Sequence, residues 1–152
     1  MIYNISAHAN TQNIDPAIIK ELVKKGLIQA FKDDSGDIEV FKQYIHPIIT
    51  YQGDENQILP AMQLGARGAV GSTGNITRLI EKIISDRDQL SQDLITKFRP
   101  IITVNLKKVP EAIKYVLWKK DICQLYVAKS EGLTVEEMAA IDAILTKLEV
   151  NN

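Results

Sequence analysis

The sequence has a single cysteine, few aromatic residues and no excess of either charge among its 152 residues. With only Cys123 available, no internal disulfide can form, so a disulfide-stabilised secreted domain is excluded and a reducing, cytoplasmic setting is expected. Eighteen Lys and Arg residues balance nineteen Asp and Glu residues, which gives a net charge of -1. Because nucleic-acid-binding domains are usually strongly basic, we expect no nucleic-acid partner.

Long hydrophobic runs are also missing. No uncharged apolar segment approaches the roughly 20 residues that a membrane span needs. The N-terminus shows no basic region followed by an apolar stretch, so neither a membrane partner nor a signal peptide is expected. What is present is an ordinary globular composition, with 45% hydrophobic and 24% charged residues, and a length typical of one domain.

Short apolar segments alternate with helix-like segments through the first half of the chain. Such alternation predicts an α/β domain whose parallel strands are joined by right-handed crossovers. The expected strands cover residues 2–5, 27–31, 48–51 and 68–71, and the expected helices cover 16–25, 38–44, 56–64, 76–98, 100–119 and 134–149. Asp15 and Pro16 are typical of a helix start, Gly26 of a helix end, and Thr134 with Glu137 of a capping box.

Polar residues gather where the expected strands end, which is where parallel α/β folds bind ligands. They are Tyr3 and Asn4, Lys32 to Ser35, Gly53 to Glu55, and Ser72 with Thr73. Lys32 follows a nearly apolar run and should be partly desolvated, which lowers a lysine pKa and yields an amine able to form a Schiff base. Two structural alternatives stay open: a Lys32 that extends to solvent, and a Tyr3 that only packs.

Neither a metal nor a cofactor is expected. The acidic run from Asp33 to Asp37 lacks EF-hand spacing and has no nearby His or Cys. Glycines recur at 65, 68, 71 and 74, which is not the order of a dinucleotide-binding loop. A doubly wound domain that binds a phosphorylated ligand near Ser72 is a further alternative, but it would need a phosphate loop that we do not find.

Four short motifs occur in order, each at the end of an expected strand: Ile2–Ile5, Ala30–Asp37, Gly53–Glu55 and Gly68–Asn75. With Leu59-Pro60-Ala61 and Leu64-Gly65-Ala66 between the last two, they resemble the N-acetylneuraminate lyase and dihydrodipicolinate synthase family of class I aldolases over residues 2–80. The resemblance implies the C-terminal half of a (β/α)8 TIM barrel, about four parallel βα units within residues 1–98. A C-terminal helical extension, residues 99–152, would pack on it.

The resemblance also implies a function. Lys32 would form a Schiff base with a 2-keto acid such as pyruvate, and Tyr3 would move the proton as a carbon–carbon bond breaks or forms. Substrate contacts are expected from Gly53, Asp54, Glu55, Ser72 and Asp34, with Asp54 and Glu55 near a hydroxyl-bearing tail. The Gly71-Ser72-Thr73 motif resembles that of the sugar-acid lyases more closely than that of the dihydrodipicolinate synthases. The alternative is a non-catalytic half-barrel remnant that oligomerises without turnover.

Three residues depart from the family pattern. Ser6 stands where proline is usual, and His8 where the synthases carry an arginine for a dicarboxylic substrate. Asp34 replaces the usual serine or threonine, where a carboxylate would either repel an acidic substrate or pair with Lys32 and raise its pKa.

Length is a fourth departure, because a barrel of this type takes about 250 residues. A half-barrel has two open sheet edges and an uncovered apolar interior. We therefore expect a homo-oligomer, or a partner chain that supplies the first half of the barrel.

Overall fold

The computed structural model describes residues 1–6, 12–46, 48–125 and 130–149, with side chains described as far as residue 147. His8, which the sequence analysis singled out, lies outside these residues. Four strands form one parallel sheet in the order β1-β2-β3-β4, so each strand pairs with the next along the chain. They are β1 (Ile2–Asn4), β2 (Ala30–Asp33), β3 (Ile49–Gln52) and β4 (Gly68–Ala69). The predicted half of a (β/α)8 barrel is confirmed.

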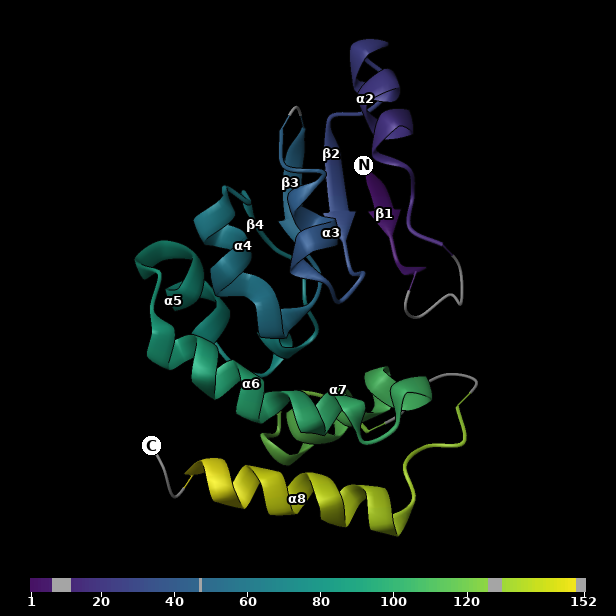
Figure 1. Ribbon diagram of the computed structural model, residues 1–152. Helices are drawn as coiled ribbons and strands as arrows, with labels where there is room; N and C mark the ends of the chain where they lie inside the picture. Colours follow the sequence, from purple (N-terminus) through teal and green to yellow (C-terminus); the bar gives the residue numbers. More distant parts are fainter. Residues whose placement is uncertain (7–11, 47, 126–129, 150–152) are drawn as a thin grey trace.

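Helices follow each strand and then continue as a separate layer. The first set is α2 (Pro16–Lys24), α3 (Ile38–Lys42), η1 (Glu55–Gln57), α4 (Ile58–Leu64), η2 (Thr73–Asn75) and α5 (Leu79–Asp86). The second set is α6 (Gln89–Thr103), η3 (Leu106–Lys108), α7 (Val109–Lys119) and α8 (Val135–Glu149). Figure 1 shows α6, α7 and α8 lying below the sheet, toward the ends to which the strand arrows point. None of the described helices is long and apolar enough to cross a membrane.

The predicted helix-end residues act as expected. Asp15 accepts a hydrogen bond from the Ala17 amide at 2.8 Å, and Pro16 is the first residue of α2. Gly26 ends the segment with a φ of 69°, in the left-handed region that glycine enters without strain. At the start of α8 the Thr134 amide donates to Glu137 Oε2 at 2.8 Å, and the Glu137 amide donates to Thr134 Oγ1 at 3.2 Å, which completes the capping box.

Some predicted boundaries were wrong. The helix expected at 76–98 is two helices, because Arg87 takes a left-handed φ of 58° and Asp88 then caps α6 by accepting from the Ser91 amide at 3.0 Å. The following helix was expected to start at Pro100, yet α6 continues through Pro100 to Thr103. Strand β2 starts three residues later and ends two residues later than predicted, so Lys32 is inside the strand and not after it. The division of the chain at residues 98 and 99 falls within α6 and stays a prediction.

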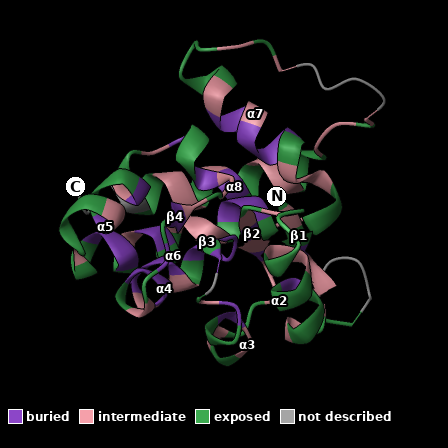
Figure 2. Ribbon diagram, turned by 90° about the horizontal axis from the view of Figure 1, so that it is seen from above, coloured by how far each residue is buried: buried purple, intermediate pink, exposed green. Residues whose placement is uncertain are grey.

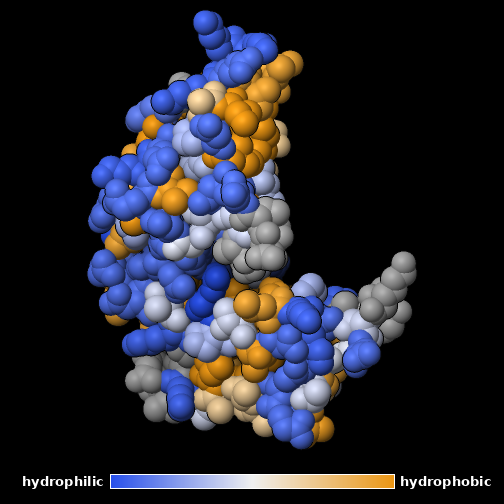
Figure 3. Space-filling view, turned by 45° about the vertical axis from the view of Figure 1, so that its right-hand side comes forward, coloured by the Kyte–Doolittle hydropathy of each residue, from blue (hydrophilic) through white to orange (hydrophobic). Residues whose placement is uncertain are grey.

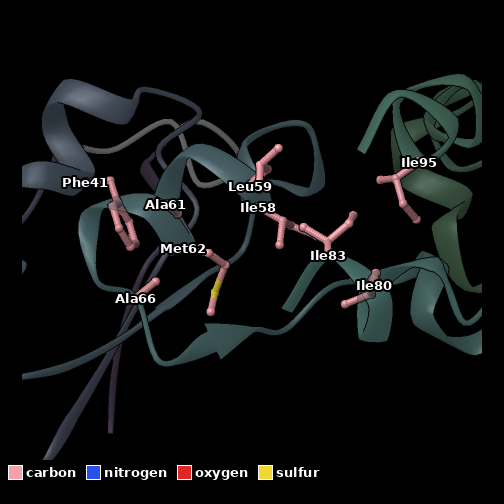
Figure 4. Close-up of a cluster of buried hydrophobic side chains, with 9 residues drawn as sticks. All are labelled: Phe41, Ile58, Leu59, Ala61, Met62, Ala66, Ile80, Ile83 and Ile95. Atoms are coloured by element: carbon pink, nitrogen blue, oxygen red, sulfur yellow. The ribbon is translucent and has the colours of Figure 1, made fainter. Parts of the chain in front are cut away.

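Apolar packing holds the first set of helices to one face of the sheet and joins the second set to them through α6. One cluster joins α3, α4, α5 and α6, as Figure 4 shows. A second joins α6, α7 and α8, and a third places Phe31 of β2 against Ile19 of α2 and Tyr44. Figure 2 shows buried residues on the inward sides of α4 and α7, whereas α2 is exposed over most of its surface. Helix α6 takes part in two clusters and therefore fixes the helical layer relative to the sheet.

The other face of the sheet keeps apolar side chains in contact with solvent. Tyr3 is 40% exposed, Ile49 49% and Val70 45%. In β1 and β3 these residues alternate with the buried Asn4 and Thr50, as expected when successive side chains point to opposite faces. In an eight-stranded barrel this face would point into the packed interior.

Candidate active site

A cleft of about 350 Å³ lies between the carboxyl ends of the strands and the helical layer. Figure 3 shows the surface hollowed between these two parts of the molecule. From the sheet side and its following loops the cleft is lined by Tyr3, Ile5, Lys32, Asp34, Gly53, Glu55, Val70, Gly71 and Ser72. From the helical side it is lined by Arg99, Ile102, Thr103, Leu106 and Val109.

Three side chains meet at the β1–β2 side of the cleft, and we call them the Lys32 cluster: Tyr3, Lys32 and Asp34. The strand register places Tyr3 directly beside Lys32. Lys32 Nζ lies 3.9 Å from the centre of the Tyr3 ring and 4.0 Å from Asp34 Oδ2. The Tyr3 hydroxyl donates a hydrogen bond to Asp34 Oδ2 at 2.6 Å. An amine, a phenol and a carboxylate thus share one small volume.

Burial shifts the proton affinity of both reactive groups in this cluster. The pKa of Lys32 is lowered from its usual value, chiefly because burial disfavours the ammonium form, while the charges of Asp34 and Glu55 oppose the shift. The effect of burial on the Lys32 pKa is therefore larger than the opposing effect of the Asp34 charge. The Lys32 side chain is only 13% exposed, so it is not a lysine that extends into solvent. The pKa of Tyr3 is raised well above its usual range by burial and by the hydrogen bond to Asp34.

A second group of charges lies deeper, and we call it the Glu55 cluster: Asp54, Glu55, Thr73 and Arg99. Glu55 is 1% exposed, and its Oε1 accepts from the Thr73 amide at 2.6 Å and from Thr73 Oγ1 at 2.8 Å. Arg99 Nη1 lies 3.5 Å from Glu55 Oε2 and 3.6 Å from Asp54 Oδ1. This cluster ties η1, η2 and α6 together.

Two glycines leave room for these carboxylates. A Cβ on Gly53 would lie 2.8 Å from Asp34 Cβ and Cγ and from the Asp33 carbonyl oxygen. A Cβ on Gly71 would lie 2.7 Å from Glu55 Cδ and closer still to its Oε1. Both distances are shorter than real contacts allow, so each position needs glycine. Gly53 is thereby linked to the Lys32 cluster and Gly71 to the Glu55 cluster.

Most of the residues singled out from the sequence come together. Tyr3, Lys32, Asp34, Gly53, Glu55 and Ser72 all line the cleft. Asp54 does not line it; buried behind the cleft, Asp54 caps η1 by accepting from the Asn56 amide at 3.1 Å. Within the part of the chain that the structure describes, no group of three or more His, Cys, Asp or Glu side chains could hold a metal ion.

Sequence reasoning missed the helical wall of the cleft. Arg99 is a charged residue in the middle of α6, and no local motif marks it. Its approach to Glu55 depends on how α6 crosses beneath the sheet. The apolar wall residues Ile102 and Val109 carry the ordinary helical pattern, so their sequence gives no sign of a ligand site.

Comparisons with known proteins support a family assignment. The model of the dihydrodipicolinate synthetase family matches residues 1–140. A 4-hydroxy-tetrahydrodipicolinate synthase from Exiguobacterium sp. is 30% identical over 111 residues, which are 67% of this chain and 38% of that protein. The synthase from Chloroherpeton thalassium is 24% identical over 97% of this chain and 53% of its own length. The chain thus spans about half the length, or less, of these relatives.

Solved structures show the same fold. The dihydrodipicolinate synthase of Bacteroides thetaiotaomicron superposes with a TM-score of 0.77 at 22% identity, over 95% of this chain and 54% of that one. YagE, a prophage protein of the dihydrodipicolinic acid synthase family from Escherichia coli K12 solved with pyruvate, gives a TM-score of 0.81 at 16% identity, over 97% and 55%. The two structures agree that this chain corresponds to about half of a barrel protein.

Proposed function

Because this chain belongs to the dihydrodipicolinate synthetase family, we propose that it is a class I aldolase or lyase that cleaves or forms a carbon–carbon bond next to a 2-keto acid. Lys32 carries the Schiff base. One observation supports this most: the Lys32 amine lies in the cleft at the strand ends, with its pKa lowered by burial and a phenol beside it. A larger fraction of neutral amine is what attack on a ketone requires.

The chemistry divides among the residues of the cleft. Lys32 Nζ attacks the carbonyl carbon of a pyruvate-type acid, and loss of water leaves a protonated imine. When the carbon–carbon bond beyond the carbon next to the imine breaks, its electron pair forms the carbon–carbon double bond of an enamine, and the π electrons of the C=N bond move to the nitrogen. The leaving fragment becomes a carbonyl compound as its hydroxyl group loses a proton. Tyr3 moves the proton that this step requires, since its hydroxyl group belongs to the same cluster as Lys32.

The remaining contacts set the substrate class. Ser72, Gly53 and Glu55 line the cleft, with Asp54 buried behind it. We propose that a hydroxyl-bearing tail of the substrate lies at the Glu55 end. Carboxylates accept hydrogen bonds from hydroxyl groups, so a sugar acid suits this end of the cleft better than a second anionic group. The Gly71-Ser72-Thr73 motif favours the same substrate class.

Borohydride reduction in the presence of pyruvate tests the proposal. Reduction converts an imine into a stable amine, so mass spectrometry of peptides should place one adduct on Lys32. Lys32→Met should abolish the adduct. Lys20→Met, the same change on an exposed lysine of α2, should retain it. A folded chain without an adduct at Lys32 would overturn the catalytic proposal and favour a non-catalytic half-barrel.

We further propose that the exposed face of the sheet is covered by a second copy of the chain or by a chain that carries the first half of the barrel. The apolar exposure of Ile49 and Val70 and the open edge of the three-residue strand β1 support this. Light scattering should give a mass above 17.0 kDa. A well-behaved particle of that mass would contradict the proposal.

A further inference from the structure

Asp34 is the carboxylate that meets both reactive groups of the cleft. Its Oδ2 accepts from the Tyr3 hydroxyl at 2.6 Å and lies 4.0 Å from Lys32 Nζ. The Asp34 amide donates to the Asn4 carbonyl at 2.8 Å, which holds the residue at the junction of β1 and β2. The side chain is only 13% exposed, so this geometry does not depend on a freely moving surface group.

The loop after β3 is shaped around this carboxylate. The Gly53 amide donates to the Asp33 carbonyl at 2.6 Å, which brings the two loops together. At that separation a Cβ on residue 53 would collide with Asp34 Cβ and Cγ. The close approach of Gly53 therefore confines the Asp34 side chain beside the Tyr3 hydroxyl.

The direction of the hydrogen bond limits what Tyr3 can do. A phenol has one hydrogen to donate, and in Tyr3 that hydrogen is directed to Asp34. The Tyr3 oxygen is therefore left as an acceptor toward the cleft. A free phenolate beside the Asp34 carboxylate would place two negative charges together, so Tyr3 needs somewhere to send its proton when it accepts another.

We propose that Asp34 is the terminal proton acceptor of this site: Tyr3 Oη takes a proton from the imine-bound substrate while the phenolic proton of Tyr3 passes to Asp34 Oδ2. This inference rests on the proposed function and adds a role for Asp34 beyond substrate contact.

The step balances in both atoms and charge. For a bound pyruvate, the C–H bond of the methyl group breaks, and its electron pair forms the carbon–carbon double bond of an enamine. The π electrons of the C=N bond move to the nitrogen, and the positive imine becomes neutral. The substrate proton is then on Tyr3, and the former Tyr3 proton is on Asp34, which also becomes neutral. No charge is separated, which favours the step in a partly desolvated cleft.

Hydrogen–deuterium exchange of the pyruvate methyl group in D2O tests the relay without a second substrate. The exchange rate, followed by proton NMR, is divided by the amount of imine trapped on Lys32 by borohydride at the same pH. Asp34→Asn keeps the shape of the side chain but removes the carboxylate that takes up the proton. The exchange rate per imine should therefore fall by about 100-fold, as for loss of a general base. Asp34→Glu keeps a carboxylate and should restore part of the loss.

A titration tests whether Asp34 and Tyr3 are coupled in the free protein. The difference in ultraviolet absorbance between the chain and its Tyr3→Phe variant reports the ionisation of Tyr3. In the Asp34→Asn background the pKa of Tyr3 should move down toward its usual value, because the carboxylate that helps to raise it is gone. Asp86→Asn, on an exposed residue at the end of α5, is the matched control and should change neither measurement.

Each outcome decides something. Exchange per imine that is unchanged in Asp34→Asn, or an unmoved Tyr3 titration, would overturn the relay and leave the Schiff-base proposal intact. Absence of any imine on Lys32 in the unsubstituted chain would overturn both proposals together.

Discussion

The two charged clusters of the cleft use their carboxylates in opposite ways. Glu55 is 1% exposed, and its Oε1 accepts two hydrogen bonds from Thr73. Asp34 is more accessible; its Oδ2 accepts a hydrogen bond from the Tyr3 hydroxyl and lies 4.0 Å from the Lys32 amine. The Glu55 cluster thus connects three elements of the fold, whereas the Lys32 cluster places ionisable groups against one another.

Burial alone therefore does not identify a reactive group. Backbone and hydroxyl donors to a buried carboxylate fix its position. A carboxylate whose partner is a phenol affects the proton affinity of that partner. We expect substitutions in the Glu55 cluster to change mainly the free energy of unfolding, and those in the Lys32 cluster to change mainly proton transfer.

The largest effect on stability should come from Gly71→Ala. The added Cβ would occupy the space of the Glu55 carboxylate and force it away from Thr73. Losing these hydrogen bonds in a buried site should lower the free energy of unfolding by about 3 kcal/mol. Gly74→Ala is the control, since its Cβ would meet Ile80 Cδ1 at an ordinary 3.5 Å. Urea unfolding should separate the two variants, and equal midpoints would contradict the structural role of Glu55.

A smaller loss should follow from Arg99→Met. This change keeps the aliphatic part of the side chain but removes the cation that lies 3.5 Å from Glu55 Oε2. Because Arg99 is 20% exposed, solvent offsets part of the lost attraction, and we expect a decrease of about 2 kcal/mol in the free energy of unfolding. Arg67→Met, on an exposed loop residue, should change it by less than about 0.5 kcal/mol. Equal free energies of unfolding for the two variants would mean that Arg99 does not stabilise the Glu55 cluster.

The sequence was sufficient to locate the Lys32 cluster, and the reason is geometric. Parallel strands bring their carboxyl ends to one edge, so a polar residue at the end of each apolar run marks the site. Tyr3 and Lys32 could be paired in this way because they are neighbours in register. The hydrogen bond between Tyr3 and Asp34 could not, since it also depends on the close approach of Gly53 from another loop.

Only part of the Glu55 cluster could be predicted from the sequence. Asp54 and Glu55 follow a strand, but Arg99 reaches them only because α6 packs through Ile95 on one side and through Ile101 and Ile102 on the other. The break between α5 and α6 was hidden as well, because Arg87 is a non-glycine residue in a left-handed conformation. Such features follow from tertiary packing, which a helical pattern does not encode.

Ser72→Ala should affect ligand affinity more than stability. Ser72 lines the cleft between the two clusters, next to Gly71 and Thr73. Loss of one hydroxyl contact with the acid should weaken pyruvate binding about fivefold, or ~1 kcal/mol. The concentration of pyruvate that gives half-maximal borohydride trapping on Lys32 measures this. Ser85→Ala, on an exposed residue of α5, is the control, and a matching value for both variants would remove Ser72 from the binding site.

The smallest effect should be a pH dependence of stability that belongs to Lys32. Its pKa in the folded chain is below the usual lysine value, so between these two values the unfolded chain binds more protons. The free energy of unfolding therefore rises with pH through that window. The chain should gain stability relative to Lys32→Met as the pH approaches 10.5, and Lys20→Met gives the background of a lysine replacement. Urea unfolding at a series of alkaline pH values provides the measurement. If the stability of the chain relative to Lys32→Met instead falls with pH, the attraction of Lys32 to Asp34 outweighs its burial. The Lys32 cluster would then stabilise the fold through its charges, as the Glu55 cluster does.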